Sequence, residues 1–226
     1  MERSNGLYSP QMEHDSCGIG CIANIDGTKS HEILRDSLTM LERMEHRGGT
    51  GSDPQSGDGA GVLIQIPHEY LRDQCVALNI ELPDQGKYAV GMLFFPQNSA
   101  VREECRKVLN QYIEKLGFEL LGYRRVPVDS TVPGKTAASV APVIEQVFIQ
   151  PSVALESIED FERKVFVLRN AATHHIGEKV QGNFGDFYVS SFSARVTWAA
   201  TSSLFGRSTS QRVASSRLSS KRRETS

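Results

Sequence analysis

The chain has 226 residues, of which 39% are apolar and 23% are charged, so it can bury a core and does not have the composition of a disordered protein. Its 25 basic and 27 acidic side chains nearly cancel, which gives no reason to expect nucleic acid or an anionic membrane as a partner. No apolar run approaches the roughly 20 residues of a membrane helix, and the N-terminus lacks the basic start and apolar stretch of a signal peptide. These features predict a soluble cytoplasmic protein with no nucleic-acid or membrane partner.

The cysteines argue against a disulfide scaffold or a metal site. Four in a chain of this length are too few for such a scaffold, and Cys17 and Cys21 are four residues apart rather than three. The only histidine pair, at 174–175, is far away in the sequence. We therefore predict that the chain binds no metal.

The first elements are expected close to the N-terminus. Residues 1–16 are polar and lack periodicity, as in a leader segment. Residues 17–25, "CGIGCIANI", alternate small and apolar side chains and predict a strand, which a turn at Asp26 and Gly27 would end. A helix should follow from a cap at Ser30, with apolar positions at a period of 3.6 residues, and end at Gly48 and Gly49.

The middle of the chain predicts two strands and the clearest helix. The runs "VLIQI" at 62–66 and "YAVGMLFF" at 88–95 have the length and composition of strands. A helix capped by Ser99 should run to Gly117, with Cys105 in its apolar stripe and hence in the core.

Further strands are expected at 118–126, 142–151 and 186–198, with a helix over about 157–174 between the last two. Because strands outnumber helices and adjoin one another, the pattern favours an α+β fold with largely antiparallel sheets over a doubly wound one. Residues 199–226 are rich in Ser and Arg and carry a net charge of about +5, which leaves about −7 on the rest. We predict disorder there, and interpret the tail as a solvated or non-native terminus rather than an RNA-binding segment.

The segment "EHRGGTGSDPQSGDGAG" at 45–61 has six glycines in seventeen residues. It fits either a helix end followed by turns or a loop wrapped around a ligand. A phosphate-binding loop is excluded, because such a loop opens a helix, and here the glycines lead into the strand signal "VLIQI".

The best candidate for chemistry is the thiol of Cys17. An internal cysteine has a pKa near 8.5 and needs a base or a positive charge nearby to be a good nucleophile. A cut between Ser16 and Cys17 would create an α-amine with a pKa of roughly 7.7 to 8, which could serve as that base. One cleavage would therefore supply both groups.

Four runs together resemble a known family. "LYSPQMEHDSCGIGCIA", "MEHRGGTGSDPQSGDGAGVLIQIP", "PVIEQVFIQP" and "DFYVSSFSAR" are similar in order and spacing to the start of the glutamate synthase large subunit. That part of the family is a glutamine amidotransferase domain of class II, the N-terminal-nucleophile type. The resemblance covers about residues 7–197.

The resemblance implies roles for particular residues. Residues 1–16 would be a propeptide, and Cys17 the nucleophile that hydrolyses L-glutamine to glutamate and ammonia through a thioester. Arg47 and Gly48 of "HRGG" would lie near that nucleophile, while Asp58 and Gly59 of "SGDGAG" would shape the site. The implied fold is the N-terminal-nucleophile αββα four-layer sandwich.

The resemblance stops after "FYVSSFSARV". The family continues with motifs of the type H-S-R-F-S-T-N and N-G-E-I, which bind the glutamine carboxylate and stabilise the oxyanion, and neither occurs here. We therefore expect residues 17–198 to be a partial domain, a sandwich incomplete at its C-terminus, with little activity in isolation. No cofactor is expected in this segment, since FMN and an iron–sulfur cluster are implied only for other domains of the family. A second hypothesis is a catalytically inactive fragment that associates with other glutamate synthase domains or subunits through an exposed sheet edge.

Overall fold

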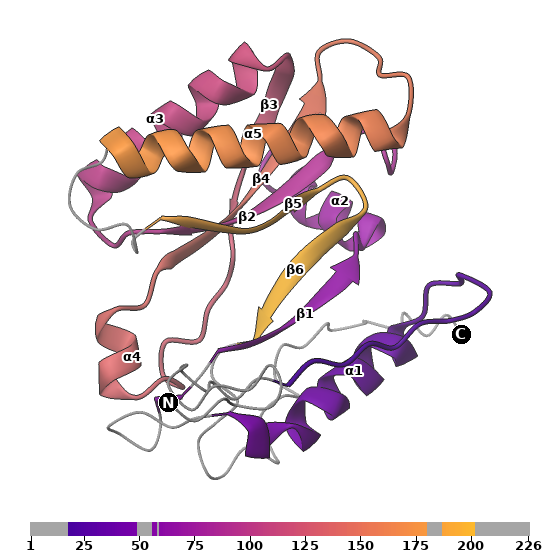
Figure 1. Cartoon of the computed structure of the whole chain (residues 1–226), viewed down its shortest axis with the longest axis vertical. Coiled ribbons are helices and arrows are strands. Elements are labelled where there is room, and N and C mark those ends of the chain that lie inside the picture. The colour runs from indigo at the N-terminus through magenta and orange to yellow at the C-terminus, as the bar shows by residue number, and fades with distance from the viewer. Residues whose placement is uncertain (1–17, 49–55, 58, 180–186, 202–226) are drawn as a thin grey trace, which may run out of the picture.

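A computed structural model describes residues 18–48, 56–57, 59–179 and 187–201 (Figure 1). The predicted propeptide, the nucleophile Cys17, Asp58 and most of the Ser/Arg-rich tail lie outside these residues. In chain order the elements are α1 (His31–Arg43), the 3-10 turn η1 (Glu45–Arg47), β1 (Ala60–Gln65), α2 (His68–Val76), β2 (Ala89–Phe95), α3 (Ser99–Lys115), β3 (Phe118–Arg125), α4 (Lys135–Ser139), β4 (Val143–Pro151), α5 (Ile158–Lys179), β5 (Tyr188–Ser193) and β6 (Val196–Thr201).

The strands form two antiparallel sheets. Four strands are arranged in the order β3–β4–β2–β5, and β1 pairs with β6 in a separate two-stranded sheet. This mixture of helices and antiparallel sheets confirms the predicted α+β class.

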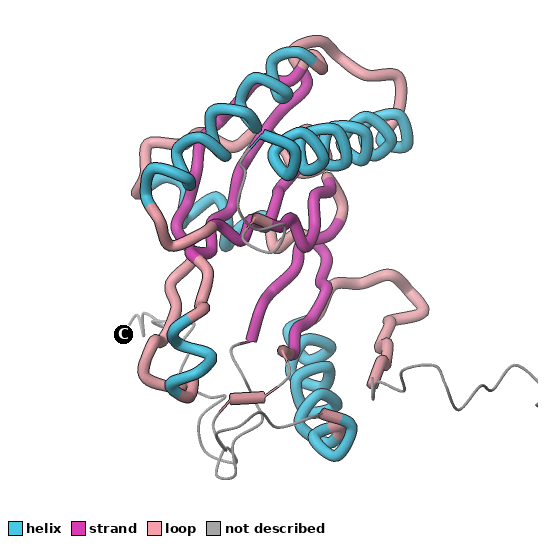
Figure 2. Tube along the Cα trace, turned by 60° about the vertical axis from the view of Figure 1, so that its left-hand side comes forward, coloured by secondary structure: helices cyan, strands magenta, loops and turns pink. Residues whose placement is uncertain are grey.

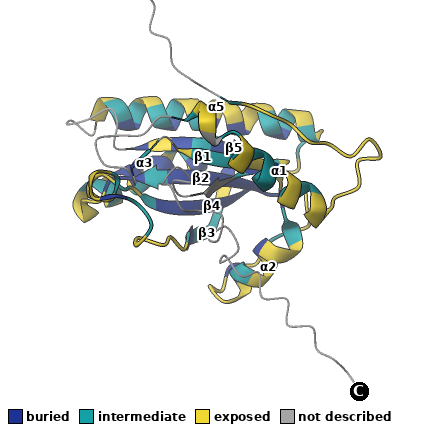
Figure 3. Cartoon of the chain, turned by 90° about the horizontal axis from the view of Figure 1, so that it is seen from below, coloured by how far each residue is buried: buried dark blue, intermediate teal, exposed yellow. Residues whose placement is uncertain are grey.

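The larger sheet is covered on both faces because its strands alternate. Ala89, Leu93 and Phe95 of β2 point to one face, where α3 and α5 supply the rest of the main core. Tyr88 and Val90 belong to a second cluster on the opposite face, with Leu71 and Cys75 of α2. Figure 3 shows α5 and α2 on opposite sides of the strands, with buried residues concentrated between them. Cys105 is one of the core residues, as its place in the apolar stripe predicts.

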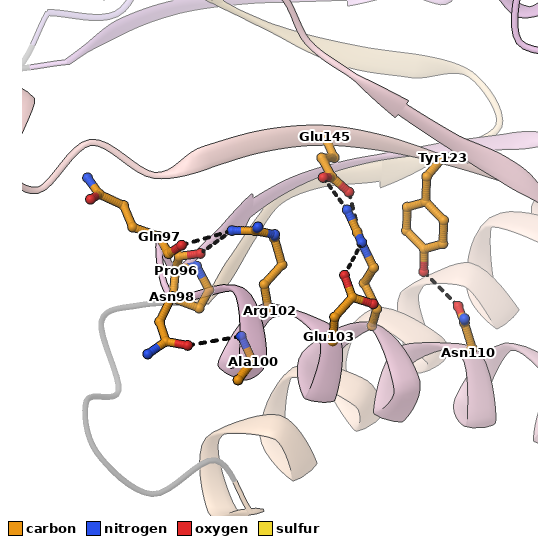
Figure 4. Close-up of polar contacts among 10 residues, drawn as sticks. Pro96, Gln97, Asn98, Ala100, Arg102, Glu103, Asn110, Tyr123 and Glu145 are labelled. Carbon is orange, nitrogen blue, oxygen red and sulfur yellow. Dashed lines mark hydrogen bonds and ion pairs between the residues drawn. The ribbon is translucent and has the colours of Figure 1, made fainter.

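One side of the main core holds a nearly buried ion pair (Figure 4). Glu145 of β4 accepts hydrogen bonds from the guanidinium of Arg106 on α3, with Nε to Oε2 at 3.1 Å, and Arg106 also pairs with the exposed Glu103. The same guanidinium lies over the rings of Phe95 and Tyr123. The pair thus ties α3 to the middle of the sheet.

A bend at Ala194 and Arg195 connects the two sheets. The sequence pattern predicts one strand over 186–198, but the structure has two, β5 in the larger sheet and β6 in the smaller one. The carboxylate of Glu162 on α5 accepts from the Ser193 hydroxyl and the Ala194 N–H, both at 2.8 Å. The prediction of one strand was wrong because the apolar pattern of residues 186–198 continues across the bend, so the sequence does not show where the chain leaves one sheet for the other. β6 also runs past the predicted boundary at 198, to Thr201.

The predicted strand at the N-terminus is also wrong within the described residues, since 18–24 form no strand. A methyl group placed on Gly20 would lie 2.4 Å from Sδ of Met40, so this stretch packs closely against α1. The small residues of this stretch therefore allow it to pack against α1, and they do not pair in a strand. The turn that follows is present, with the Gly27 N–H donating to the Asn24 carbonyl at 3.0 Å.

Some helix ends follow their sequence signals, but α1 ends at Arg43 rather than at Gly48, and α5 continues to Lys179 rather than ending near residue 174. Ser30 caps α1 through the Glu32 N–H, and Gly117, at φ +79°, follows the end of α3. The cap of α3 is Asn98 rather than the predicted Ser99, because Asn98 has the extended backbone of a cap and accepts from two backbone N–H groups. α2 and α4 were not predicted. Within the described residues, none of the helices combines the length and the apolar character that crossing a membrane requires.

Candidate active site

A cavity of about 630 Å³ lies between residues 18–22, the C-terminal half of α1, η1 and the β1–β6 sheet. Its walls are mostly apolar, with Met40 and Met44 from the helix side and Trp198 from β6. In Figure 1, α1 and the β1–β6 pair lie together, away from the layer formed by α3 and α5. The cavity therefore belongs to the smaller sheet rather than to the main core.

Three of the predicted site residues line this cavity. Arg47 and Gly48 reach it from the end of η1, and Gly59 reaches it from the start of β1. Gly18, the residue after Cys17, is also part of the wall. Cys17 and Asp58 lie outside the described residues, so their side chains are not placed.

Gly18 is in close contact with the segment that carries Arg47. A methyl group placed on Gly18 would lie 3.1 Å from Sδ of Met44 and 3.4 Å from Cβ of Arg47. These separations are at or below ordinary van der Waals contact, so a larger residue at position 18 would have to displace its neighbours. The backbone one residue from Cys17 therefore lies next to the arginine predicted to assist it.

The end of α1 determines where Arg47 stands. The Met44 N–H donates to the carbonyls of Met40 and Leu41 at 3.1 and 3.0 Å, which closes the helix. The Arg47 N–H then donates to the Met44 carbonyl at 2.8 Å and turns the chain through η1. The Arg47 side chain is exposed and lines the cavity.

The opposite wall is formed by the glycine-rich loop and β1. Ser56 is only 6% exposed, and its hydroxyl accepts a hydrogen bond from the Ala137 N–H of α4 at 3.1 Å. Gly61 lies under the indole of Trp198, since a methyl group there would be 2.2 Å from Cζ2. A methyl group on Gly59, by contrast, would meet no described atom within 4 Å.

The three described cysteines differ sharply in environment. Burial raises the pKa of the Cys75 thiol to about 11, although the nearby Arg124 guanidinium lowers it. Cys105 is buried as well, whereas Cys21 is exposed and lines the cavity. Neither of the buried thiols is suited to act as a nucleophile at neutral pH.

The sequence did not single out Trp198 or Met44, which line the cavity, or Ser56, which lies beside it and contacts α4. Trp198 reaches the cavity because β6 pairs with β1, which sets Leu63 opposite it. Ser56 is one of several small polar residues in its loop, and no local pattern reveals its contact with the distant Ala137. The one usable signal was that Trp198 is the sole tryptophan of the chain.

The chain is similar to known proteins over most of its length. The pattern of the class-II glutamine amidotransferase family matches residues 17–200. The large chain of NADPH-dependent glutamate synthase from Bacillus subtilis is 42% identical over 200 residues, which are 86% of this chain and 12% of that protein. The NADH-dependent glutamate synthase of Schizosaccharomyces pombe is 37% identical over 79% of this chain and 9% of its own length. The chloroplastic ferredoxin-dependent glutamate synthase 2 of Arabidopsis thaliana is 36% identical over 80% of this chain and 11% of its own length.

The chain spans about a tenth of the length of these relatives. The family match begins at Cys17 and ends at residue 200, within β6, so it includes every residue that lines the cavity. The chain therefore belongs to the class-II glutamine amidotransferases.

Proposed function

We propose that this chain is the glutaminase part of a glutamate synthase and that Cys17 is its nucleophile. The observation that carries the proposal is the contact between Gly18 and Arg47 in the cavity that Gly48 and Gly59 also line. In this contact the residue that follows Cys17 packs against the aliphatic part of the Arg47 side chain. The family match supports glutamine as the substrate.

Removal of residues 1–16 would make Cys17 the first residue of the mature chain. Its α-amine, with a pKa of roughly 7.7 to 8, would take the thiol proton while the sulfur attacks the side-chain amide carbon of glutamine. Proton return to the amide nitrogen expels ammonia and leaves a γ-glutamyl thioester. Water then cleaves the thioester, which releases glutamate and restores the thiol.

Arg47 would favour the thiolate by its charge rather than by taking a proton, because a guanidinium stays protonated throughout the physiological range. Gly48 would allow the chain to turn closely past the nucleophile. Asp58 and Gly59 would shape the wall opposite Arg47.

We further propose that the complete domain is an αββα four-layer sandwich. In support, α3 and α5 cover one face of the larger sheet, and α1 packs against β1 of the smaller one. The partners would be other glutamate synthase domains or subunits, which would use the released ammonia. FMN and the iron–sulfur cluster implied for full-length members are assigned to no residue of this chain.

The test is an intact mass of the purified chain before and after exposure to 6-diazo-5-oxo-norleucine, a glutamine analogue that alkylates such cysteines. Loss of residues 1–16 and a single adduct on Cys17 would show that this partial site matures and binds the analogue, whereas little ammonia release from glutamine is expected because the carboxylate-binding and oxyanion motifs are missing. Cys17→Ala should abolish the adduct. The matched control is Cys21→Ala, which removes the exposed thiol of the same segment and should leave the adduct in place. An adduct that persists in Cys17→Ala would refute the assignment.

A second candidate is a non-catalytic role in assembly. Among the described strands β1 and β6 pair only with each other, so a strand of another chain could add at the edge of this small sheet. An unprocessed, unlabelled chain that co-purifies with a complete glutamate synthase subunit would favour this function over the first.

A further inference from the structure

An arm of the chain leaves the larger sheet between β3 and β4. Residues 127–142, here called the β3–β4 arm, run outward from the sheet. At the base of this arm the Val126 N–H donates a hydrogen bond to the Ile144 carbonyl at 2.9 Å. Figures 1 and 2 both show α4, at the tip of the arm, beyond the end of the larger sheet and at the level of the α1 end of the molecule. Most arm side chains are at least partly exposed, so burial in a core does not explain the position of this segment.

The tip of the arm contacts the glycine-rich loop of the candidate site. The N–H of Ala137 in α4 donates to the Ser56 hydroxyl at 3.1 Å, across 81 positions of sequence. Ser56 is buried, at 6% exposure, and lies two residues before Asp58 and three before Gly59. This bond joins the arm directly to the segment that enters the cavity wall.

The hydrogen bond from the Ala137 N–H to Ser56 satisfies a donor in the first turn of α4, as an N-cap side chain normally would. The residue before α4 is Gly134, which has no side chain and forms no cap bond. The Ala137 N–H belongs to the first turn and has no partner within the helix. Ser56 supplies the hydroxyl acceptor that Ser, Thr or Asp would supply locally. The first turn of α4 and the position of the loop are therefore stabilised by the same bond.

The arm is held at its base as well. Gln97, which follows β2, donates from Nε2 to the Ala141 carbonyl at 2.8 Å. Asp129 accepts from the Thr131 N–H and hydroxyl at 2.9 and 2.6 Å. Prolines at 127, 133 and 142 restrict the backbone further. These restraints make the arm a firm support for the loop.

We infer that Ser56 is a positioning residue of the amidotransferase site. Through its bond to Ala137, the β3–β4 arm holds the loop that leads to Gly59 against the cavity, and so sets how well glutamine is held beside Cys17. The inference rests on the proposed function. Ser56 acts through the loop and does not touch the reacting atoms.

The first test measures amide hydrogen exchange in the full chain for Ser56→Ala, Ser56→Thr and the control Ser139→Ala. Ser139 lies in α4 and its hydroxyl donates only to the Thr136 carbonyl in the same helix. Ser56→Ala should speed exchange at residues 135–139 and at 59–61 together, by on the order of fivefold, the effect of one cap bond. Ser56→Thr keeps the hydroxyl, so exchange at both segments should be as slow as in the wild type. Ser139→Ala should leave the exchange rate at residues 59–61 unchanged. Faster exchange confined to one of the two segments in Ser56→Ala would overturn the coupling.

The second test compares two alkylation rates at Cys17, followed by mass spectrometry of the peptide. With 6-diazo-5-oxo-norleucine, which must be held as glutamine is, Ser56→Ala should react about fivefold more slowly than the wild type. With iodoacetamide, which needs only the thiolate, the two should react equally. Equal slowing with both reagents, or faster reaction with iodoacetamide, would indicate a general structural defect and overturn the positioning role. A wild-type chain that fails to react with the glutamine analogue would overturn the proposed function, and the exchange comparison would still decide the coupling.

Discussion

Gly18 lies against Arg47: a methyl group on Gly18 would come within 3.4 Å of the arginine Cβ. The two residues are brought together because α1 reverses the chain between them and η1 turns Arg47 back toward residues 18–22. Since Gly18 follows the proposed nucleophile Cys17 directly, this contact leads to the first prediction.

Replacement of Arg47 by Met should raise the pKa of the Cys17 thiol, because it removes a cation that favours the thiolate. The alkylation rate of Cys17, followed against pH with iodoacetamide, should show a midpoint about one pH unit higher than in the wild type. Arg43→Met is the control, since Arg43 is also basic and exposed but lies one turn earlier, at the end of α1. Equal profiles for the wild type and Arg47→Met would contradict the role.

Gly61→Ala should disturb the β1–β6 sheet. The added methyl group would lie 2.2 Å from the Trp198 ring, so the indole must move, at a cost of about 1 to 3 kcal/mol in the free energy of unfolding. Because Trp198 is the sole tryptophan, its fluorescence reports the displacement directly, and a shift to longer wavelength is expected. Gly59→Ala, whose methyl group meets no described atom within 4 Å, should leave both stability and emission close to the wild type. Identical spectra for all three chains would mean that the indole does not cover Gly61.

Glu145→Ala should be strongly destabilising, because it leaves the Arg106 guanidinium partly buried without its main partner. The side chain of Glu145 is 5% exposed and that of Arg106 is 25% exposed, so a loss of about 2 to 3 kcal/mol in the free energy of unfolding is expected. Glu103→Ala is the matched control, since it removes the other carboxylate of the same arginine at 65% exposure, where a pair contributes about 0 to 1 kcal/mol. Denaturant unfolding of the two variants measures both losses of stability. Equal losses would show that burial does not determine how much each ion pair contributes to the free energy of unfolding.

Cys75 should make the fold less stable at alkaline pH. Burial raises its pKa to about 11 from an ordinary 9.0, so the folded chain holds this proton more tightly than the unfolded chain. The unfolded state therefore loses its proton first, and the free energy of unfolding should fall by about 2 to 3 kcal/mol as the pH rises from 9.0 to about 11. Well below pH 9.0 the thiol is protonated in both states and contributes no pH dependence.

Cys75→Ala should remove that part of the alkaline slope, whatever its effect on stability at pH 7. Cys21→Ala, which removes an exposed thiol, should keep the slope of the wild type. Unfolding curves at pH 8, 9, 10 and 11 for the three chains provide the measurement. The prediction fails if Cys75→Ala retains the full slope.

The local signals of the sequence determined most of the elements. The apolar period of 3.6 residues identified α1, α3 and α5, and short runs of β-branched and aromatic residues identified β1 to β4, because both patterns arise from residues close together in the chain. The family motifs also led to Arg47, Gly48 and Gly59, which line one cavity in the structure. The α+β class followed from the order of these elements.

Only the tertiary structure decided how distant segments meet. The bend at Ala194 and Arg195, which sends β6 to pair with β1, depends on a carboxylate from α5 that no local pattern reveals. The packing of residues 18–22 against Met40 and the cap that Ser56 gives to α4 are likewise contacts between remote parts of the chain. Propensity and periodicity describe each residue against its near neighbours, whereas register, packing and long-range hydrogen bonds depend on which surfaces are buried together. The sequence by itself thus determined the elements and the candidate chemistry, and the three-dimensional packing decided which of these residues share a site.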